Sequence, residues 1–423
     1  MSESRPTPAP KLAHLALLAL IAVALVLRVA AALYLDYEPD GDFKAYWAMA
    51  VSMLSTGHMN DGMGNVAYYS SGYPILLVPF FGIFGSAPMV GYMVNAVLGG
   101  LSVWLTYLVA RYVLPTWRWA LLAAAVWAFY PVSILYPAYL AKENLMIPLL
   151  VWQLLLIFQY PTSKRPLLSA LVLGLVFGFE LLVGAAVLAT GLLIGLAVVG
   201  YRIWPVKQIT RHYRAIAALI VGCLLMVGPW LAYTAHELGK PVLATNAGFN
   251  LYLGNNPNAT GYYVGIEDTP IAPEWHRLKD EMGEIKVMSH LGDLARDYIK
   301  AHPGHTVVLS MKKFVYFWWP PVQDGKGPGS FVETVMRLVW LAFYAVIVPL
   351  ALVPLFRPRG LTRESLLCFG TVLLYCAPYV VTYVIYRYRL PAMPIMSVLA
   401  VYGAWQLYGA LFKSGAPQQA RTA

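Results

Sequence analysis

The sequence predicts an all-α, polytopic membrane protein with about ten transmembrane helices. Of its 423 residues, 59% are hydrophobic and 12% are charged, whereas an ordinary soluble domain has about 25% charged residues. This apolar surface exceeds what one core can bury, so lipid must cover part of it. Runs such as 11–35 and 215–233 approach or exceed the roughly 20 residues that cross the hydrocarbon layer. In lipid such runs must be helical, because a helix satisfies its own backbone hydrogen bonds.

Apolar runs separated by helix breakers give the individual spans. We expect helices at 12–35, 89–113, 119–137, 143–160, 166–180, 182–201, 214–236, 335–355, 364–385 and 390–412. The segment 166–201 has two interpretations: two short helices, or one long tilted helix with Glu180 near its middle. The first run is longer than the roughly 7 to 15 residues of a signal-peptide core, so we interpret it as a retained helix.

The distribution of charge orients these helices. One set of short loops is basic and nearly free of acids: it carries Arg118, Lys164, Arg165, Arg202, Lys207, Arg211, Arg214, Arg357, Arg359 and Arg363. Basic loops of this kind face the cytoplasm. Both termini are therefore expected in the cytoplasm, as short tails at 1–11 and 413–423.

This topology places two long segments on the outer face. Residues 12–236 hold helices 1 to 7 and include the first outer loop at 36–88. Residues 237–334 form a large outer loop of mixed charge, and residues 335–412 hold helices 8 to 10. Long polar loops usually carry binding and catalytic residues, so we expect the function on the outer face.

The first outer loop begins with acids, among them Asp40 and Asp42. Taken alone, they are equally well interpreted as the solvated flank of the first helix. However, apolar or aromatic residues recur at helical spacing after Asp42, at Tyr46, Ala50 and Leu54. The Asp42 carboxylate would then lie at the start of a membrane-surface helix. The stretch 72–84 is too short to span and is expected to lie along the interface, where both helices would frame a cleft floored by lipid.

A second acid, Glu143, lies at the outer start of the helix expected at 143–160, next to Lys142. One interpretation is an interfacial anchor or a helix-start charge, which contributes about 0.3 to 1 kcal/mol through the helix dipole. The other is functional: Asp42 and Glu143 would face one outer cavity. Paired carboxylates can deprotonate an acceptor and hold hydroxyls, or hold a divalent cation as a cofactor.

Two arginines, Arg387 and Arg389, fall on the outer side in a turn between apolar helices, against the positive-inside trend. Snorkelling of both side chains to the outer headgroups is one interpretation. The other is a phosphate site, because the guanidinium fork matches phosphate oxygens. At this depth the natural ligand is the phosphodiester of a lipid.

These motifs, taken together, resemble the bacterial GT-C membrane glycosyltransferases, in the branch of the protein O-mannosyltransferases and the lipid A aminoarabinose transferase. The similar segments occur in chain order over most of the sequence: Asp42-x-x-x-Tyr46, Ser71-Gly72-Tyr73-Pro74, Lys142-Glu143, Gly228-Pro229-Trp230 to Pro241, the run from Asn250 to Gly261, His302-Pro303-Gly304, and Arg387-Tyr388-Arg389-Leu390-Pro391. The most specific piece is Leu251-Tyr252-Leu253-Gly254-Asn255-Asn256-Pro257.

The resemblance implies a GT-C-type bundle that transfers a monosaccharide, with inversion, from an undecaprenyl-phosphate carrier to a cell-envelope acceptor. The active site would face the periplasm from the bacterial inner membrane. Asp42 would take the catalytic position, with Asp40 as the alternative, and Arg387 would bind the donor phosphate, helped by Lys142 or Arg389. The residues expected to contact the sugar or the acceptor are Tyr46, Tyr73, Glu143, Asn255 and Asn256.

Departures from the family pattern leave the substrates open. Trp230 is followed by Leu231, where many relatives have Arg-Asn, and Ser70-Ser71 replaces a frequent Arg-Pro-Pro. Asn255 and Asn256 have a second interpretation, as a turn that satisfies its own backbone. The alternative function is a transporter or flippase of a lipid-linked or anionic substrate, for which Arg28 and Glu180 would be the intramembrane charges. A third is a ligase or scaffold acting on envelope polymers.

Overall fold

The structure is a computed structural model that describes residues 8–200, 209–319, 331–357 and 360–412. Most of the two expected tails lies outside the described residues, as do Arg202, Lys207 and Arg359. Most of the described residues are helical. Their one β-type contact is an isolated parallel bridge between Tyr262 and Val384. The all-α fold class is therefore confirmed.

Eight helices in the described part of the chain are long and apolar enough to cross a membrane. They coincide or overlap with α1 (Lys11–Leu35), α4 (Pro88–Val113), α7 (Glu143–Gln159), α8 (Pro166–Val183), α10 (Ile209–Leu238), α14 (Phe331–Leu352), α15 (Arg363–Val381) and α16 (Met393–Phe412). A ninth span exists if a bent pair counts as one: α5 (Trp117–Ala128) and the segment Pro131–Ala138 meet at 63°. That segment comprises α6 (Pro131–Leu135) and η1 (Tyr136–Ala138).

Within the described residues, the eight or nine spans differ from the expected helices at two places. The expected helix 119–137 bends before Pro131, because proline lacks an N–H and disfavours a helical residue before it. The expected helix 182–201 is not a span. Gly184 is extended (φ 179°, ψ 126°) and ends α8, and only η3 (Ala185–Thr190) and the short α9 (Gly191–Gly200) follow.

Both outer segments fold into helices. The first outer loop contains α2 (Gly41–Thr56) and α3 (Gly72–Phe84), as expected from its apolar spacing. The second contains α11 (Ala247–Gly254), η4 (Ile266–Asp268), α12 (Ala272–Ala301) and α13 (Pro303–Trp318). Three short 3₁₀ turns complete the fold: η2 (Tyr160–Thr162), η5 (Val353–Phe356) and η7 (Tyr386–Ala392).

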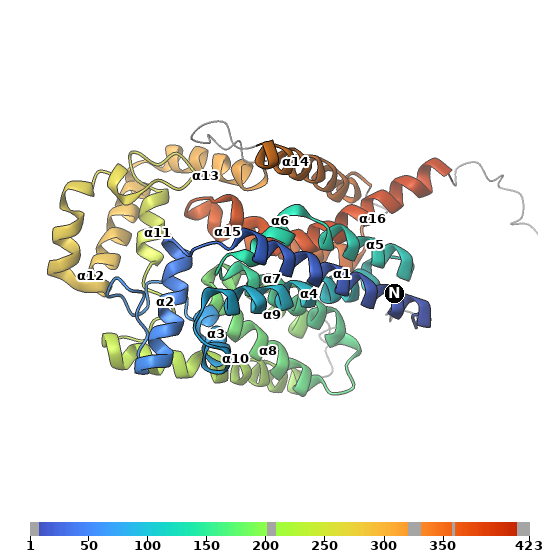
Figure 1. Ribbon diagram of the computed structural model, residues 1–423, viewed down its shortest axis with the longest axis horizontal. Coiled ribbons are helices and arrows are strands. Elements are labelled where there is room, and N and C mark those ends of the chain that lie inside the picture. Colours follow the sequence, from blue (N-terminus) through green and yellow to red (C-terminus); the bar gives the residue numbers. More distant parts are fainter. Residues whose placement is uncertain (1–7, 201–208, 320–330, 358–359, 413–423) are drawn as a thin grey trace, which may run out of the picture.

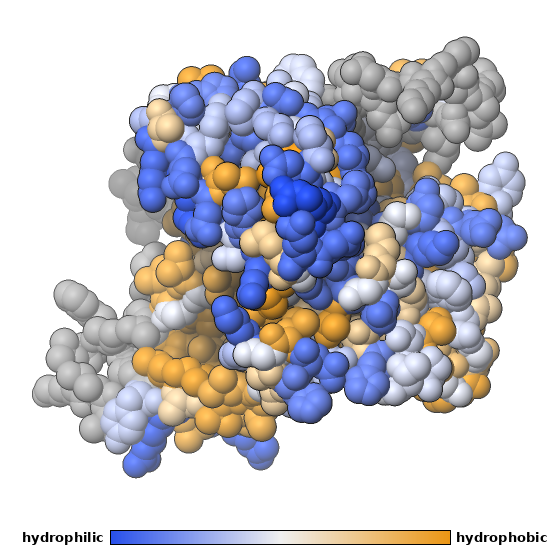
Figure 2. All heavy atoms as spheres, turned by 90° about the vertical axis from the view of Figure 1, so that its left-hand side faces the viewer, coloured by the Kyte–Doolittle hydropathy of each residue, from blue (hydrophilic) through white to orange (hydrophobic). Residues whose placement is uncertain are grey.

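The spanning helices and the outer helices occupy different ends of the molecule. In Figure 1, α2, α11 and α12 lie together at the left end, while α1 begins and α16 ends at the right. One large hydrophobic core runs through the spanning helices. A smaller cluster, which includes Phe249, Trp275 and Leu291, holds α11 on α12. Figure 2 looks onto the left end, where hydrophilic side chains dominate the upper part and hydrophobic ones show below.

Candidate active site

The candidate site is centred on Arg387, which lies between Asp42 and Glu143. The Arg387 Nη2 donates a hydrogen bond to one Asp42 carboxylate oxygen. Its Nε lies 3.7 Å from Glu143 Oε1, within ion-pair range, and forms no hydrogen bond. The Arg387 side chain is 15% exposed and that of Glu143 is 5% exposed, whereas Asp42 is 38% exposed. The site therefore has a buried floor and one carboxylate open at its mouth.

Three chain segments bring these charges together. Asp42 lies in the first turn of α2, where its negative charge is favoured by the helix dipole. The turn before it needs Gly41, whose φ is +47°. Glu143 is the first residue of α7, and Arg387 belongs to η7, immediately before α16. Because all three positions are helix termini or turns, their side chains can converge without interrupting a membrane helix.

Each of the two carboxylates also accepts a hydrogen bond from a tyrosine hydroxyl. The Tyr69 hydroxyl donates to Asp42 Oδ1 at 3.1 Å, and the Tyr136 hydroxyl donates to Glu143 Oε2 at 3.1 Å. Burial, together with the adjacent Asp42 carboxylate, raises the pKa of Tyr69 well above its ordinary value, so this hydroxyl stays a donor. Sequence analysis missed both tyrosines. Tyr69 could have been found from its place just before the Ser71-Gly72-Tyr73-Pro74 segment.

The Arg387 guanidinium also has aromatic neighbours. It lies 5.2 Å from the centre of the Phe43 ring and 6.0 Å from that of Tyr388. Contacts of this type stabilise a cation by roughly 0.5 to 2 kcal/mol each. Both rings therefore lie within the distance at which an aromatic ring stabilises a guanidinium.

Lys142, the expected second phosphate ligand, lies at the edge of the same cluster. Its ammonium approaches Gly184, where a β-carbon added to the glycine would be 3.6 Å from Nζ. Burial is the largest cause of a lowered pKa for Lys142; Arg387 lowers it further, while Glu143 and Asp42 partly offset the shift. Lys142 is thus a second cation near the carboxylates, with donors to offer to a phosphate.

Arg389, two residues from Arg387, is placed elsewhere. It is only 2% exposed, and its guanidinium donates to the carbonyl of Trp319 at 2.8 Å and to the Tyr344 hydroxyl at 3.0 Å. A third donor reaches the carbonyl of Tyr386 at 3.2 Å. Through these hydrogen bonds, Arg389 joins η7 to the end of α13 and to α14. The structure does not bring it to the carboxylates.

Asn255 and Asn256 also lie apart from the cluster. Both are buried, and their amides donate to carbonyls at the end of α11: Asn255 to Leu251 at 2.9 Å and Asn256 to Tyr252 at 2.9 Å. Asn255 donates additionally to the carbonyl of Val381. This geometry matches the alternative interpretation, a turn that satisfies its own backbone, because the amide donors are already used within the protein.

The remaining expected residues differ in their distance from the charges. Tyr46 is 4% exposed and packs edge-on against Tyr69 and Tyr73, at 5.5 and 5.8 Å between ring centres. Tyr73 is fully buried and donates to Asn95. Tyr46 therefore contacts Tyr69, which donates to Asp42, and Tyr73 contacts Tyr46. Asp40 precedes α2 and accepts a hydrogen bond from Tyr37, so its carboxylate is held outside the Arg387 pair.

Asp42 and Glu143, the two acids expected as possible ligands of a divalent cation, both lie against the Arg387 guanidinium. In the described part of the chain, no group of three or more His, Cys, Asp or Glu side chains could hold a metal ion. Between Asp42 and Glu143, where a divalent cation would have to bind, lies the Arg387 guanidinium. The residues present therefore fit an arginine-bridged carboxylate pair and not a metal bound by both acids.

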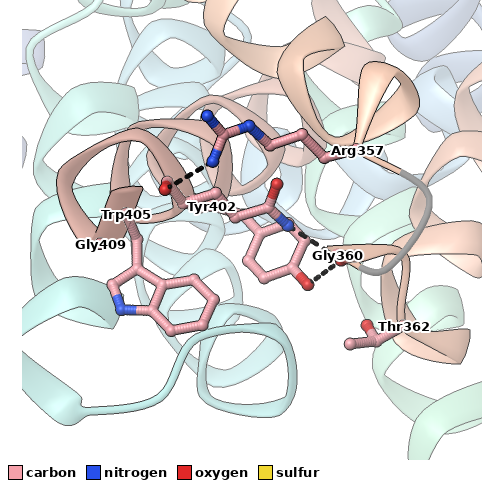
Figure 3. Close-up of a pocket in the computed structure, with 7 residues that line it drawn as sticks. Arg357, Gly360, Thr362, Tyr402, Trp405 and Gly409 are labelled. Carbon is pink, nitrogen blue, oxygen red and sulfur yellow. Dashed lines mark hydrogen bonds between the residues drawn. The ribbon is translucent and has the colours of Figure 1, made fainter. Parts of the chain in front are cut away.

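A separate cavity of about 780 Å³ lies toward the other end of α16 (Figure 3). Among its lining residues, Arg357 donates to the carbonyl of Gln406 at 3.1 Å, and the Gln406 amide donates to the carbonyl of Gly360 at 2.8 Å. Gln406 lies 13 positions after Met393, which is roughly 20 Å along a helix. This cavity is therefore distinct from the charged cluster.

No model of a known protein family and no curated protein matches this sequence. The fold, in contrast, matches solved structures. The oligosaccharyltransferase AglB from Archaeoglobus fulgidus, in complex with an inhibitory peptide and a dolichol-phosphate, has a TM-score of 0.50 and 14% identity over 96% of this chain. The Archaeoglobus fulgidus oligosaccharyltransferase in complex with Zn and sulfate has a TM-score of 0.52 and 13% identity over 94%.

ArnT from Cupriavidus metallidurans, bound to undecaprenyl phosphate, has a TM-score of 0.44 and 15% identity over 96% of this chain and 80% of its own. The chain spans about half the length of the two oligosaccharyltransferases, 52% and 49%. It is a multi-pass membrane protein with the GT-C-type fold, which confirms the fold that the sequence motifs implied.

Proposed function

We propose that this protein is an inverting glycosyltransferase that moves a monosaccharide from a polyprenyl-phosphate carrier to a cell-envelope acceptor. The observation that carries the proposal is the position of Arg387 between Asp42 and Glu143. A polyprenyl-phosphate donor needs a cation for its phosphate beside a carboxylate for the acceptor. The GT-C-type fold supports the proposal, and AglB, which shares this fold, was solved with a dolichol-phosphate.

The chemistry follows from the two kinds of charge. An acceptor hydroxyl attacks the anomeric carbon, its proton passes to Asp42, and the bond to the carrier oxygen breaks. The electron pair of that bond leaves with the polyprenyl phosphate, whose added negative charge is stabilised by Arg387 and Lys142. Tyr69 orients the Asp42 carboxylate through its hydrogen bond. Attack from the face opposite the leaving phosphate inverts the anomeric centre.

The acceptor decides how Asp42 is used. A hydroxyl acceptor, of a lipid, a glycan or a protein, requires Asp42 as a base. A phosphate acceptor is already ionised, and Asp42 would then only position groups. The 38% exposed Asp42 side chain is open to either acceptor from the outer side.

The arrangement supports no step that depends on a metal. A divalent cation, which we expected as one use of Asp42 and Glu143, would have to displace the Arg387 guanidinium from between them. The Zn in one oligosaccharyltransferase structure belongs to that protein. Arg387 is suited to the electrostatic work that a cation would otherwise do, because its guanidinium lies against both carboxylates and its fork of donors matches phosphate oxygens.

Transport or flipping of a lipid-linked substrate is the second candidate. It is favoured by Glu180, a fully buried carboxylate within α8, since intramembrane acids often mark a transport pathway. Glu180 is nevertheless near one end of α8, and a flip of the Gln153 amide gives it a neutral partner at 2.9 Å. The charged cluster at the outer end is better explained by transfer.

We also propose that the site faces the periplasm of a bacterial inner membrane, with both termini in the cytoplasm. The basic loops support this orientation, as does the position of α1's start and α16's end away from α2 and α12 (Figure 1).

The test is transfer from a panel of synthetic polyprenyl-phosphate sugars to membrane extract, by the purified full chain in nanodiscs. Asp42→Asn and Arg387→Ala should each lower transfer by at least about 100-fold. Glu38→Gln, which changes an acid of the same loop outside the charged cluster, is the matched control and should transfer as the wild type does. Wild-type protein that consumes no donor, or Asp42→Asn protein that transfers normally, would remove the catalytic assignment and promote the transport function.

A further inference from the structure

Glu284 in α12 fastens the first outer loop to the second outer segment. Its carboxylate accepts hydrogen bonds from the backbone N–H of Val66 at 2.8 Å and of Ala67 at 3.2 Å. It also accepts one from the Thr245 hydroxyl at 2.6 Å. The Thr245 N–H in turn donates to the carbonyl of Ala67 at 2.8 Å. Two segments that are far apart in the sequence are therefore joined through the Glu284 carboxylate and, beside it, through the backbone hydrogen bond from Thr245 to Ala67.

The local backbone is built to present this carboxylate. Gly283, directly before Glu284, has φ +71° and ψ 171°, which interrupts α12 with a kink. A residue with a side chain is strained at this φ, so the kink favours glycine. Glu284 begins the second half of the helix and reaches the loop. Ionised carboxylates accept stronger hydrogen bonds than neutral groups, and this one receives all three of the bonds described above.

The attachment is adjacent to the catalytic contact. Tyr69, which donates to Asp42, follows Ala67 by two residues. Between them, the Tyr68 ring packs edge-on against Phe249 of α11, with ring centres 5.5 Å apart. The earlier half of the loop has a separate support, because the N–H of Met59 donates to the Tyr233 hydroxyl of α10. Glu284 therefore fixes the half of the loop that ends in Tyr69.

We propose that Glu284 is a positioning residue for the transfer reaction: it sets the place of the Tyr69 hydroxyl, and through it the orientation of the Asp42 carboxylate. This inference rests on the proposed function for its catalytic part. Glu284 acts at a distance from Asp42 and from the phosphate ligands. Its effect is transmitted by the short backbone from Val66 to Tyr69, because a small displacement of a catalytic group lowers the rate steeply.

Three variants and one control isolate the contact. Glu284→Ala removes all acceptors, Glu284→Gln keeps one of the two oxygens, and Thr245→Val removes the hydroxyl with little change of shape. Glu281→Gln is the matched control, since Glu281 lies on the same helix in an exposed ion pair with Arg277. All are measured as the full chain in nanodiscs, at equal folded yield.

The first readout is amide hydrogen exchange and needs no substrate. In Glu284→Ala, exchange should rise roughly tenfold or more in peptides covering 62–71, less in Glu284→Gln and Thr245→Val, and not in α1 or α4. Glu281→Gln should match the wild type throughout. Unchanged exchange at 62–71 in Glu284→Ala overturns the inference, whatever the enzyme does.

The second readout is steady-state transfer. Glu284→Ala should lower kcat by roughly 10- to 100-fold with little change in donor KM, and Glu284→Gln should recover part of the loss. If Glu284 acts through Tyr69, the loss of kcat in the double variant Glu284→Ala/Tyr69→Phe should be smaller than the product of the losses in the two single variants. Multiplicative losses, or an unchanged kcat, overturn the positioning role. Absence of transfer by the wild type would instead refute the proposed function, while hydrogen exchange still decides whether Glu284 holds the loop.

Discussion

Arg387 and Asp42, which lie 345 positions apart in the sequence, form a direct ion pair at the end of the helix bundle that carries α2. In this arrangement the cation proposed to bind phosphate and the carboxylate proposed to act as the base neutralise each other. A donor phosphate that attracts Arg387 would loosen this pair and leave Asp42 freer to accept a proton. Donor binding before proton transfer is thus an expected consequence of the geometry.

Substitution of Arg387 and substitution of Arg389, two arginines of the same turn, should have different effects. Arg387→Ala is expected to lose transfer even per folded molecule, because it removes the cation between Asp42 and Glu143. Arg389→Ala should mainly lower stability, because it leaves the carbonyls of Trp319 and Tyr386 without this donor. An unsatisfied buried group costs about 1 to 3 kcal/mol. The measurements are thermal unfolding in detergent and transfer per folded molecule.

If Arg387→Ala and Arg389→Ala lose the same share of transfer per folded molecule and unfold at the same temperature, the two arginines do not have different roles. Arg387→Lys adds a control for charge alone. A lysine keeps the positive charge but has no fork to contact two carboxylates, so we expect it to recover only a small part of the transfer.

The sequence predicted the membrane class, the helices of the first outer loop and the meeting of Asp42, Glu143 and Arg387 on one face, since hydropathy and charge placement are properties of the chain itself. The residue pattern by itself did not separate Arg387 from Arg389, and only the family resemblance gave Arg387 the first place as phosphate ligand. In a 3₁₀ turn, positions two residues apart point about 120° away from each other. One arginine therefore faces the carboxylates while the other faces α13 and α14.

Other features depended on packing that the sequence pattern does not encode. Asn255 and Asn256 belong to the most specific motif, yet their side-chain amides donate hydrogen bonds to backbone carbonyls at the end of α11. The chain has 29 tyrosines, and the sequence motifs did not distinguish Tyr69 and Tyr136 from the others. Only the structure shows that their hydroxyls donate to the two carboxylates. Pro131 is a helix breaker, but the apolar run around it led to one expected helix at 119–137, where the structure has a bend of 63°.

Glu143→Gln should lower transfer by roughly 10-fold or more while the protein remains folded. Glu143 is buried and lies 3.7 Å from Arg387 Nε, so its loss leaves the guanidinium held by Asp42 alone. The tighter remaining pair should make Asp42 harder to free. We expect kcat to fall more than donor affinity, measured by steady-state transfer beside undecaprenyl phosphate binding. A variant with normal kcat would show that Glu143 is only a helix-start charge.

Transfer should survive removal of divalent cations. Arg387 occupies the position between the two acids, and the described residues contain no alternative cluster of three metal-binding side chains. After dialysis against EDTA, the rate is expected to stay within about twofold of the untreated enzyme, with magnesium-supplemented protein as the control. A loss that added magnesium or manganese restores would contradict the arginine-bridged arrangement.

Loss of the Lys142 charge at high pH should lower kcat/KM for the donor. Burial lowers the pKa of its ammonium below the ordinary value of 10.5, and Arg387 adds to the shift. A lysine with a lowered pKa loses its charge earlier as the pH rises, so one phosphate ligand disappears before an exposed lysine would titrate. kcat/KM for the donor reports the groups of the free enzyme. It should therefore fall on the alkaline side at a pH below 10.5 in the wild type.

Lys142→Arg tests the assignment of that limit. An arginine stays charged up to about pH 12, so its alkaline fall in kcat/KM should move to higher pH even if its absolute rate is lower. Asp42, Glu143 and the acceptor are unchanged in this variant, so any limit that they set would remain in place. The same alkaline fall in both proteins would mean that another group controls it and that Lys142 does not bind the donor phosphate. A shift in Lys142→Arg alone would place the ammonium on the phosphate, because only its charge differs with pH between the two proteins.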